Sequence, residues 1–453
     1  MVIIVEQESD WTLLETTIKN SDSFWIPGFS DSVRHYICNT INWIYVYVID
    51  DDIEFIIPTG HPDGLTQDKA RLLNVLTDGN IYILGKKRLV RSALYKSYDA
   101  DLFTWWNTNK PLDLSECSTT AHDIWYQWWP GMKNSYNWFP LTKHIERCHL
   151  MKNEFMKVYA NYDMTDEYKR YDADIHNTFS FIETAGIHVD INKFKVRYDT
   201  KLLNHSRVYS EYNPYTMTGR PSNKFGGINF AALNKEDGTR EMIKSRFKSG
   251  ILLELDYDSY HPRLISKLIG YDLPKTSVHE YFGKQFYDTN ELTTEQYEQT
   301  KQLVFHSIYG GISDELSVIP YFDLIRKYTG ILWKEFKTNK EIKTPIYNRS
   351  LNSKNLNDMS ATKLFNYLIQ SYETETNMQR ILQLKKLIES KECSIVLYTY
   401  DSILLDISLT CLKEYISDIY RILTNNNEFP MKITAGNNYN EMKDVTSRLS
   451  KYL

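Results

Sequence analysis

The clearest pattern in the chain is an apolar run that ends in an acidic residue. Residues 251–263 read Ile-Leu-Leu-Glu-Leu-Asp-Tyr-Asp-Ser-Tyr-His-Pro-Arg, so Asp256 closes the run and Asp258 follows. A short apolar run bounded by polar residues is typical of a buried strand. This pattern places Asp256 at the rim of a sheet, where a divalent ion can bind. A second interpretation is that Asp256 caps a helix beginning near Pro262, because Asp is a favoured N-cap residue.

A second acidic residue follows a similar pattern near the C-terminus. Residues 394–407 form two apolar runs joined at Tyr400-Asp401-Ser402, which predicts a hairpin with Asp401 at its tip. We expect a helix over 412–425 and a last strand around 429–434 to close the chain.

Helical periodicity separates the two acidic segments. Residues 295–308 predict a helix ended by Gly310-Gly311, and Lys301, Phe305 and Tyr309 share one of its faces because they recur every fourth residue. Lys301 and Tyr309 are then about 12 Å apart along the axis, roughly the length of a nucleoside triphosphate. An amphipathic core helix gives the same spacing.

Two polar features accompany these elements. A helix over 361–388 carries Asn366 and Gln370 on a common face. A loop over 215–223 has Arg220 at its centre, and its forked guanidinium can bind phosphate. An exposed arginine in a turn is the simpler alternative.

The N-terminal part predicts a separate α/β domain. Residues 44–49 and 54–57 are β-rich runs joined by Asp50-Asp51-Asp52, and a helix over 66–76 and a strand over 80–84 follow. A metal site at the acidic cluster is conceivable, but a solvated turn explains it more simply.

Residues 151–205 are polar and helical, with a glycine stop near Gly186. The stretch 105–138 before this segment is rich in tryptophan, and domain packing or stacking on single strands explains this. The six residues are Trp105, Trp106, Trp125, Trp128, Trp129 and Trp138.

Composition narrows the class of protein. The chain has 453 residues, 42% hydrophobic, which excludes a disordered chain and leaves room for two or three domains. Its net charge of −5 requires any DNA-binding surface to be local. The five cysteines show no CxxC spacing, and neither a signal peptide nor an apolar run of about 20 residues is present. We therefore expect a cytoplasmic protein with no membrane partner.

The acidic segments, the helix and the arginine loop form a coherent set. Two carboxylates that bridge paired Mg²⁺ ions can activate a 3′-hydroxyl and stabilise a leaving pyrophosphate. Lys301 would neutralise the departing triphosphate. No P-loop is present, so a Walker-type NTPase lacks support.

Residues 165–453 resemble the family A DNA polymerases, which are like bacterial DNA polymerase I and its phage relatives. Six blocks carry the resemblance in order: the E-x-x-G segment within 181–190, the TGR loop at 218–223, motif A at 256–263, motif B at 301–310, Asn366-x3-Gln370, and motif C at 400–402.

The resemblance implies a right-hand polymerase, with α/β and α+β domains, preceded by a ribonuclease H-like exonuclease-type domain. The implied division is an exonuclease-like domain at 1–150, a reduced thumb at 151–205, palm at 206–275 and 385–453, and fingers at 276–384.

The resemblance also assigns roles to residues. Asp256, Asp401 and Lys301 are the expected catalytic residues, with both aspartates binding two Mg²⁺ ions, or Mn²⁺. Contacts to the dNTP are expected from Phe305, Tyr309, His261 and Tyr257. Contacts to primer-template DNA are expected from Arg220, Asn223, Arg263, Asn366, Gln370 and Tyr400.

Some positions depart from the family pattern. His261 replaces the motif A glutamate that helps to exclude ribonucleotides, Tyr297 replaces an arginine of motif B, and motif C has Tyr400 and Ser402 in place of histidine and glutamate. Both metal-binding aspartates remain, which favours an active enzyme.

Two features of the family are reduced or missing in this sequence, and each predicts a partner protein. The thumb segment is short, so we expect a processivity factor. We identify no D-x-E strand and no Y-x3-D motif in the places where such a domain is expected to carry them, which predicts an inactive exonuclease domain and a separate exonuclease subunit. Composition suggests a replicative enzyme of a phage or virus. The alternatives are a non-catalytic DNA-binding subunit derived from a polymerase and an RNA-synthesising relative.

Overall fold

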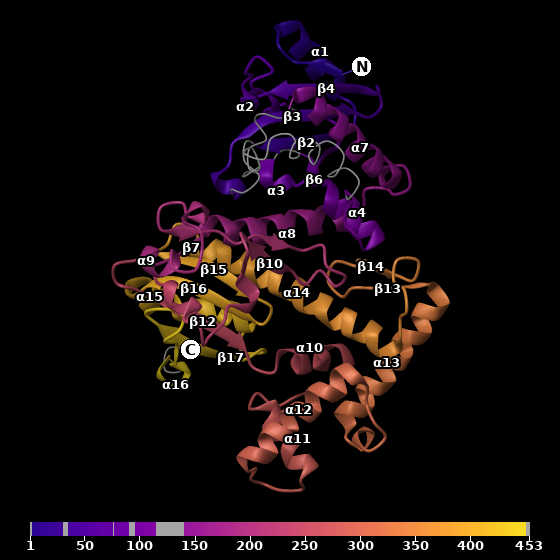
Figure 1. Ribbon diagram of the computed structural model, residues 1–453. Helices are drawn as coiled ribbons and strands as arrows, with labels where there is room; N and C mark the ends of the chain where they lie inside the picture. Colours follow the sequence, from indigo (N-terminus) through magenta and orange to yellow (C-terminus); the bar gives the residue numbers. More distant parts are fainter. Residues whose placement is uncertain (1, 30–34, 76, 90–95, 115–139, 450–453) are drawn as a thin grey trace. The chain divides into compact units, whose positions relative to one another are not determined.

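The computed structural model describes residues 2–29, 35–75, 77–89, 96–114 and 140–449 (Figure 1). The chain divides into two compact units, Met1–His176 and Asn177–Leu453. Four of the tryptophans noted above, Trp125, Trp128, Trp129 and Trp138, lie outside the described residues.

The first unit is built on a six-stranded mixed sheet in the order β1-β4-β3-β2-β5-β6. Strands β2, β3 and β4 form an antiparallel meander, whereas β5 and β6 run parallel to β2. The strands are β1 (Val2–Ile4), β2 (Ser23–Phe29), β3 (Ile41–Val48), β4 (Ile53–Pro58), β5 (Ile81–Ile83) and β6 (Ser97–Asp99).

Helices cover both faces of this sheet because its central strands are apolar on both sides. Phe24 and Trp25 are consecutive on β2 and so point to opposite faces. Trp25 packs in the cluster that contains Trp11 of α1, while Phe24 stacks on Phe155 of α7 with ring centroids 4.5 Å apart. The helices are α1 (Glu8–Ile18), α2 (Lys69–Leu73), α3 (Lys86–Leu89), α4 (Ala100–Thr108), α7 (Leu141–Tyr159) and the start of α8 (Asp166–Ala185).

The second unit is centred on a five-stranded antiparallel sheet in the order β15-β16-β12-β17-β18. Its middle strand β12 (Gly250–Tyr257) is the apolar run that ends in Asp256. The other strands are β15 (Cys393–Thr399), β16 (Ser402–Ser408), β17 (Met431–Gly436) and β18 (Lys443–Asp444).

A long helix, α14 (Ala361–Ile388), connects this sheet with a helical subdomain. That subdomain has a core of its own, formed by residues such as Phe282, Val304, Tyr321 and Phe365. The other helices are α9 (Ile191–Phe194), α10 (Tyr260–Ile269), α11 (Val278–Phe286), α12 (Thr294–Gly310), α13 (Pro320–Asn339), α15 (Leu409–Thr424) and α16 (Thr446–Leu449).

Short strand pairs complete the second unit. They are β7 (Ile187–His188) with β8 (Arg207–Val208), β13 (Glu341–Lys343) with β14 (Ser350–Asn352), and the three-stranded set β9 (Tyr212–Asn213), β10 (Ser222–Phe225) and β11 (Ile228–Asn229).

The sequence patterns predicted most of these elements. Both hairpins, the helix with Lys301 and Tyr309, and the helix over 361–388 are confirmed. The helix predicted over 66–76 is shorter, Lys69–Leu73, because Asp68 accepts the backbone N–H of Ala70 and caps it there. No described helix has the length and apolarity that crossing a bilayer requires.

Candidate functional site

The two acidic segments meet at one end of the inner strands β12 and β16 of the second sheet. Asp256 pairs with Ser402 in the β12–β16 register, and the Tyr257 N–H donates to the Asp401 carbonyl oxygen over 2.9 Å. Both aspartate side chains are exposed, and neither has an ion-pair partner among the described residues. The sheet therefore brings together two open carboxylates from segments that are far apart in the sequence.

The electrostatics of this edge favour a bound cation. Desolvation raises the pKa of Asp256 to about 7, and repulsion from Asp401 and Glu254 adds to the shift, while Lys432 and Lys235 oppose it. Desolvation and the charge of Glu373 likewise raise the pKa of Asp401. A cation would relieve both effects.

The donor set suits Mg²⁺ in particular. The described residues contain no group of three or more His, Cys, Asp or Glu side chains arranged as a metal site. Mg²⁺ is commonly bound by one or two carboxylates together with water and substrate phosphates. Asp256 and Asp401 therefore fit the ion that the sequence predicted.

The alternative role for Asp256 as a helix cap is wrong. Helix α10 begins at Tyr260, and its N-cap is Ser259, which makes no side-chain capping bond. Ser259 and Tyr400 both adopt left-handed backbone conformations, with φ of 52° and 61°. Left-handed φ is costly for such residues and is concentrated at functional sites.

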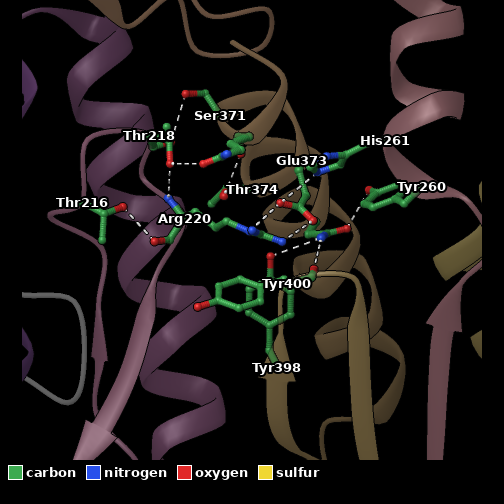
Figure 2. Close-up of polar contacts among 12 residues, drawn as sticks. Thr216, Thr218, Arg220, Tyr260, His261, Ser371, Glu373, Thr374, Tyr398 and Tyr400 are labelled. Carbon is green, nitrogen blue, oxygen red and sulfur yellow. Dashed lines mark hydrogen bonds and ion pairs between the residues drawn. The ribbon is translucent and has the colours of Figure 1, made fainter. Parts of the chain in front are cut away.

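A buried carboxylate, Glu373 of α14, lies close enough to Asp401 to raise its pKa. Its Oε2 is 2.9 Å from Arg220 Nε and 3.4 Å from His261 Nε2, and its side chain is fully buried. Figure 2 shows Glu373 between Arg220 and His261. The Arg220 guanidinium also lies over the Tyr400 ring, 3.8 Å from its centroid.

Tyr309 connects helix α12 to His261, which is the neighbour of Glu373. The Tyr309 hydroxyl forms a short hydrogen bond with His261 Nδ1, and Asn366 Nδ2 donates to the Tyr309 carbonyl over 3.0 Å. The rings of Phe305 and Tyr309 stack at 6.2 Å, and Phe305 is 38% exposed, which leaves a ring available to a ligand. Lys301 is exposed on the same helix and makes no ion pair with the described residues.

The Arg220 loop is fixed to α14. Thr218 Oγ1 donates to Gln370 Oε1 over 3.3 Å, and Ser371 Oγ donates to the Thr218 carbonyl over 3.0 Å. Arg349, which is 1% exposed, donates to the Met217 carbonyl over 3.2 Å. These bonds set the position of Arg220.

Three residues predicted for the site are buried. Tyr257 is buried, and its hydroxyl donates to the Leu423 carbonyl because the side chain points to the sheet face opposite that of Asp256. Arg263 is buried and donates to the carbonyls of Asp258, Pro274 and Thr276, which leaves its guanidinium occupied. Asn223 is 1% exposed within β10. We therefore do not retain them as ligand contacts.

Sequence reasoning missed Glu373 and Asn377. Asn377 Nδ2 donates to the Tyr400 carbonyl over 2.8 Å and so holds the turn before Asp401. The available signal was the polar run over 370–377 within a helix: six of its residues are buried, although such a run usually faces solvent.

The first unit contains its own acidic cluster. Asp99 and Asp172 are 0% and 1% exposed, and Lys86 Nζ lies 2.6 Å from Asp172 Oδ2. His176 Nε2 is 3.5 Å from a carboxylate oxygen of each aspartate. Burial raises the pKa of Asp172, but His176 and Lys86 outweigh it and bring the pKa to about 2. Asp172 thus already has a cationic partner within the protein.

A Y-x3-D segment does occur, outside the part of the chain where the motif was expected. Tyr168 and Asp172 have that spacing on α8, and the Tyr168 hydroxyl donates to Asp172 Oδ1 over 3.3 Å. The motif was overlooked because it lies beyond residue 150, where the N-terminal domain was expected to end.

Comparisons with known proteins identify the fold. No protein-family model and no curated protein matches this sequence. Among solved structures, the POL domain of Pol1 from M. smegmatis, in a complex with DNA primer-template and dNTP, is similar with a TM-score of 0.68. The similarity covers 97% of this chain and 99% of that one, at 12% sequence identity. The chain therefore has the fold of a DNA polymerase domain.

Proposed function

We propose that this chain is a family A, template-directed DNA polymerase that extends a primer 3′-end with dNTPs. The observation that carries the proposal is the open pair of carboxylates, Asp256 and Asp401, on the central sheet of a polymerase fold. The six sequence blocks and the similarity to a polymerase bound to primer-template and dNTP support it.

In the proposed reaction the primer 3′-oxygen attacks the α-phosphorus of the dNTP. A P–O bond forms to the primer, the bond to pyrophosphate breaks, and the 3′-hydroxyl proton is released to solvent. Mg²⁺ bound by Asp256 and Asp401 would supply charge neutralisation and activation of the 3′-oxygen. Lys301 binds the triphosphate, and Phe305 and Tyr309 contact base and sugar.

Nucleic acid is held by the residues around the Arg220 loop. Arg220 and Gln370 bind the primer end, with Asn366 and Tyr400 beside them. Arg220 already has one anionic partner, Glu373, so its guanidinium is oriented before DNA binds. Preorganised donors cost less to order on binding.

The domain roles follow the same proposal. The palm is formed by 206–275 and 385–453, which contribute every strand of the five-stranded sheet, and the fingers by 276–384. Within 151–205, helix α8 ends in the second unit, and only short elements follow it. This supports a reduced thumb and hence a processivity factor as partner, as expected for a phage or viral replicative enzyme.

The first unit is proposed to be an inactive exonuclease-type domain. Its mixed sheet and its Y-x3-D segment favour that ancestry, while Lys86 already pairs with the buried carboxylate of Asp172. Proofreading then requires a separate exonuclease subunit.

Extension of a labelled primer tests the function. The full chain is mixed with primer-template DNA and Mg²⁺, and with dNTPs or rNTPs in parallel. Products with dNTPs support the proposal, whereas products with rNTPs alone would assign the chain to RNA synthesis. Tight DNA binding without any product would favour the non-catalytic subunit.

A further inference from the structure

We propose that Glu373 couples the primer-end site to the nucleotide site, so that primer-template and dNTP each strengthen the binding of the other. The inference rests on the proposed function, since it assigns Arg220 to the primer and Tyr309 to the nucleotide. It identifies a positioning residue that belongs to none of the six sequence blocks.

The first step is that one carboxylate oxygen is shared. Glu373 Oε2 lies 2.9 Å from Arg220 Nε and 3.4 Å from His261 Nε2, so the two side chains compete for the same atom. Neither contact has the geometry of a hydrogen bond to this oxygen, although Arg220 Nη2 donates to Oε1 over 3.4 Å. Figure 2 shows both partners converging on Glu373.

The second step is that Glu373 must keep a partner. Its side chain is 0% exposed, and an unpaired buried charge is costly. When Arg220 turns toward an anionic primer, the Oε2 atom loses its nearer partner. The carboxylate then accepts a hydrogen bond from His261 Nε2.

The third step leads from His261 to the nucleotide site. A proton on Nε2 leaves Nδ1 as the acceptor, which is the role that the Tyr309 hydroxyl requires of it. A hydrogen bond formed at Nε2 therefore fixes the imidazole and, through it, the Tyr309 ring. That ring is stacked on Phe305, at the face where we place the sugar and base.

The chain of contacts thus runs from the loop at Arg220, through α14 and α10, to α12. Each link is a side-chain contact between described residues. Because coupling of binding is reciprocal, the nucleotide must tighten primer binding by the same factor as the primer tightens nucleotide binding.

The test uses a primer that ends in a 3′-dideoxynucleotide, so that no extension occurs. The dissociation constant of primer-template DNA is measured with and without the complementary dNTP, and a mismatched dNTP serves as the reference. In the wild-type chain we expect the complementary dNTP to tighten DNA binding. Glu373→Gln, which keeps the shape and removes the charge, should reduce this coupling factor about tenfold.

Glu375→Gln is the matched control. Glu375 lies on the same helix, is 2% exposed, and accepts the Ile346 N–H over 3.0 Å, but contacts neither Arg220 nor His261. Its replacement should leave the coupling factor unchanged. Tyr309→Phe breaks the far end of the chain of contacts and should reduce the factor as Glu373→Gln does.

The outcomes separate the two proposals. Retained coupling in Tyr309→Phe overturns the inference even if Glu373→Gln does not fold, and equal losses in the Glu373 and Glu375 variants overturn it as well. A wild-type chain that extends ordinary primers but shows no coupling refutes the inference alone. A chain that shows coupling yet never extends a primer refutes the proposed function alone.

Discussion

Asp256 and Lys432 face each other directly across the antiparallel strands β12 and β17. Residues in such opposed positions share one face of a sheet, and opposite charges there contribute roughly 0.2–1 kcal/mol. Lys432 lowers the pKa of Asp256, although desolvation and the neighbouring acids still raise it to about 7. The lysine therefore partly offsets the charge of the aspartate without neutralising it.

This relationship predicts how Mg²⁺ binding depends on pH. Below pH 7 a proton occupies Asp256 and competes with the metal, so the apparent Mg²⁺ affinity should fall as the pH drops through 7. Lys432→Met removes the opposing charge and should move this midpoint to higher pH. Mg²⁺ titrations from pH 5.5 to 8.5, followed by calorimetry, would measure both effects, and an affinity independent of pH would contradict the assignment of Asp256.

The same shift predicts the stability of the metal-free protein. The unfolded chain releases the Asp256 proton at about pH 3.9, whereas the folded chain retains it up to about pH 7. The free energy of unfolding should therefore decrease as the pH rises from 4 to 7, and added Mg²⁺ should reverse the trend. Asp256→Asn removes the titrating group, so urea unfolding of that variant should lack this contribution.

Replacing either metal-binding aspartate should abolish extension. A metal ion contributes several kcal/mol of transition-state stabilisation, so Asp256→Asn or Asp401→Asn should lower the single-turnover rate by a factor of about 1,000 or more. DNA binding should persist, because neither residue is assigned to the primer. Asp258→Asn is the control. Asp258 is not assigned to the metal, and its carboxylate lies 3.6 Å from the Arg263 guanidinium instead. Its replacement should therefore leave most of the activity intact.

The sequence predicted the carboxylate pair because each aspartate ends an apolar run. Hydrophobic patterning marks the ends of strands. Pairing of β12 with β16 is then enough to bring Asp256 and Asp401 together. The contacts of Glu373 were not predictable in this way. They depend on burial of a polar helix segment, and that burial is decided by tertiary packing around α14.

Tyr257 and Arg263 show the opposite error. Both lie in the block that resembles motif A, and the resemblance implied contacts to the dNTP and to DNA. The alternation of side chains along β12 turns Tyr257 into the core, where it stacks on Tyr260 with ring centroids 4.0 Å apart. Arg263 donates to backbone carbonyls of the segment after α10, and no sequence pattern predicted these hydrogen bonds.

Lys301 offers a test of the nucleotide site that leaves folding unaffected. It is exposed and has no ion-pair partner in the described part of the chain, so Lys301→Met should not alter the midpoint of thermal unfolding. Loss of a charge-assisted contact to the triphosphate should raise the apparent KM for dNTP or lower kcat by a factor of about 10 to 100. Lys284→Met serves as the control, because Lys284 pairs with Glu280 at 2.7 Å on a neighbouring helix. Equal kinetic effects in both variants would contradict the role of Lys301.

The acidic cluster of the first unit predicts a stability that does not depend on metal. Lys86 Nζ holds the buried Asp172 at 2.6 Å, and removing one partner of a buried ion pair typically costs about 3–5 kcal/mol. Lys86→Met should therefore destabilise the first unit by about that amount, and the double variant Lys86→Met/Asp172→Asn should recover part of the loss. Lys169→Met removes an exposed pair with Asp166 and should cost about 1 kcal/mol or less.

Urea unfolding monitored by tryptophan fluorescence, with and without Mg²⁺, would measure these differences. Because Lys86 already supplies the positive charge, Mg²⁺ should not stabilise the first unit of the wild-type chain. If Mg²⁺ restored the stability of Lys86→Met, the two aspartates would have kept their capacity to bind metal once the lysine is gone. Stabilisation of the wild-type first unit by Mg²⁺ would instead contradict the proposal that this domain is inactive.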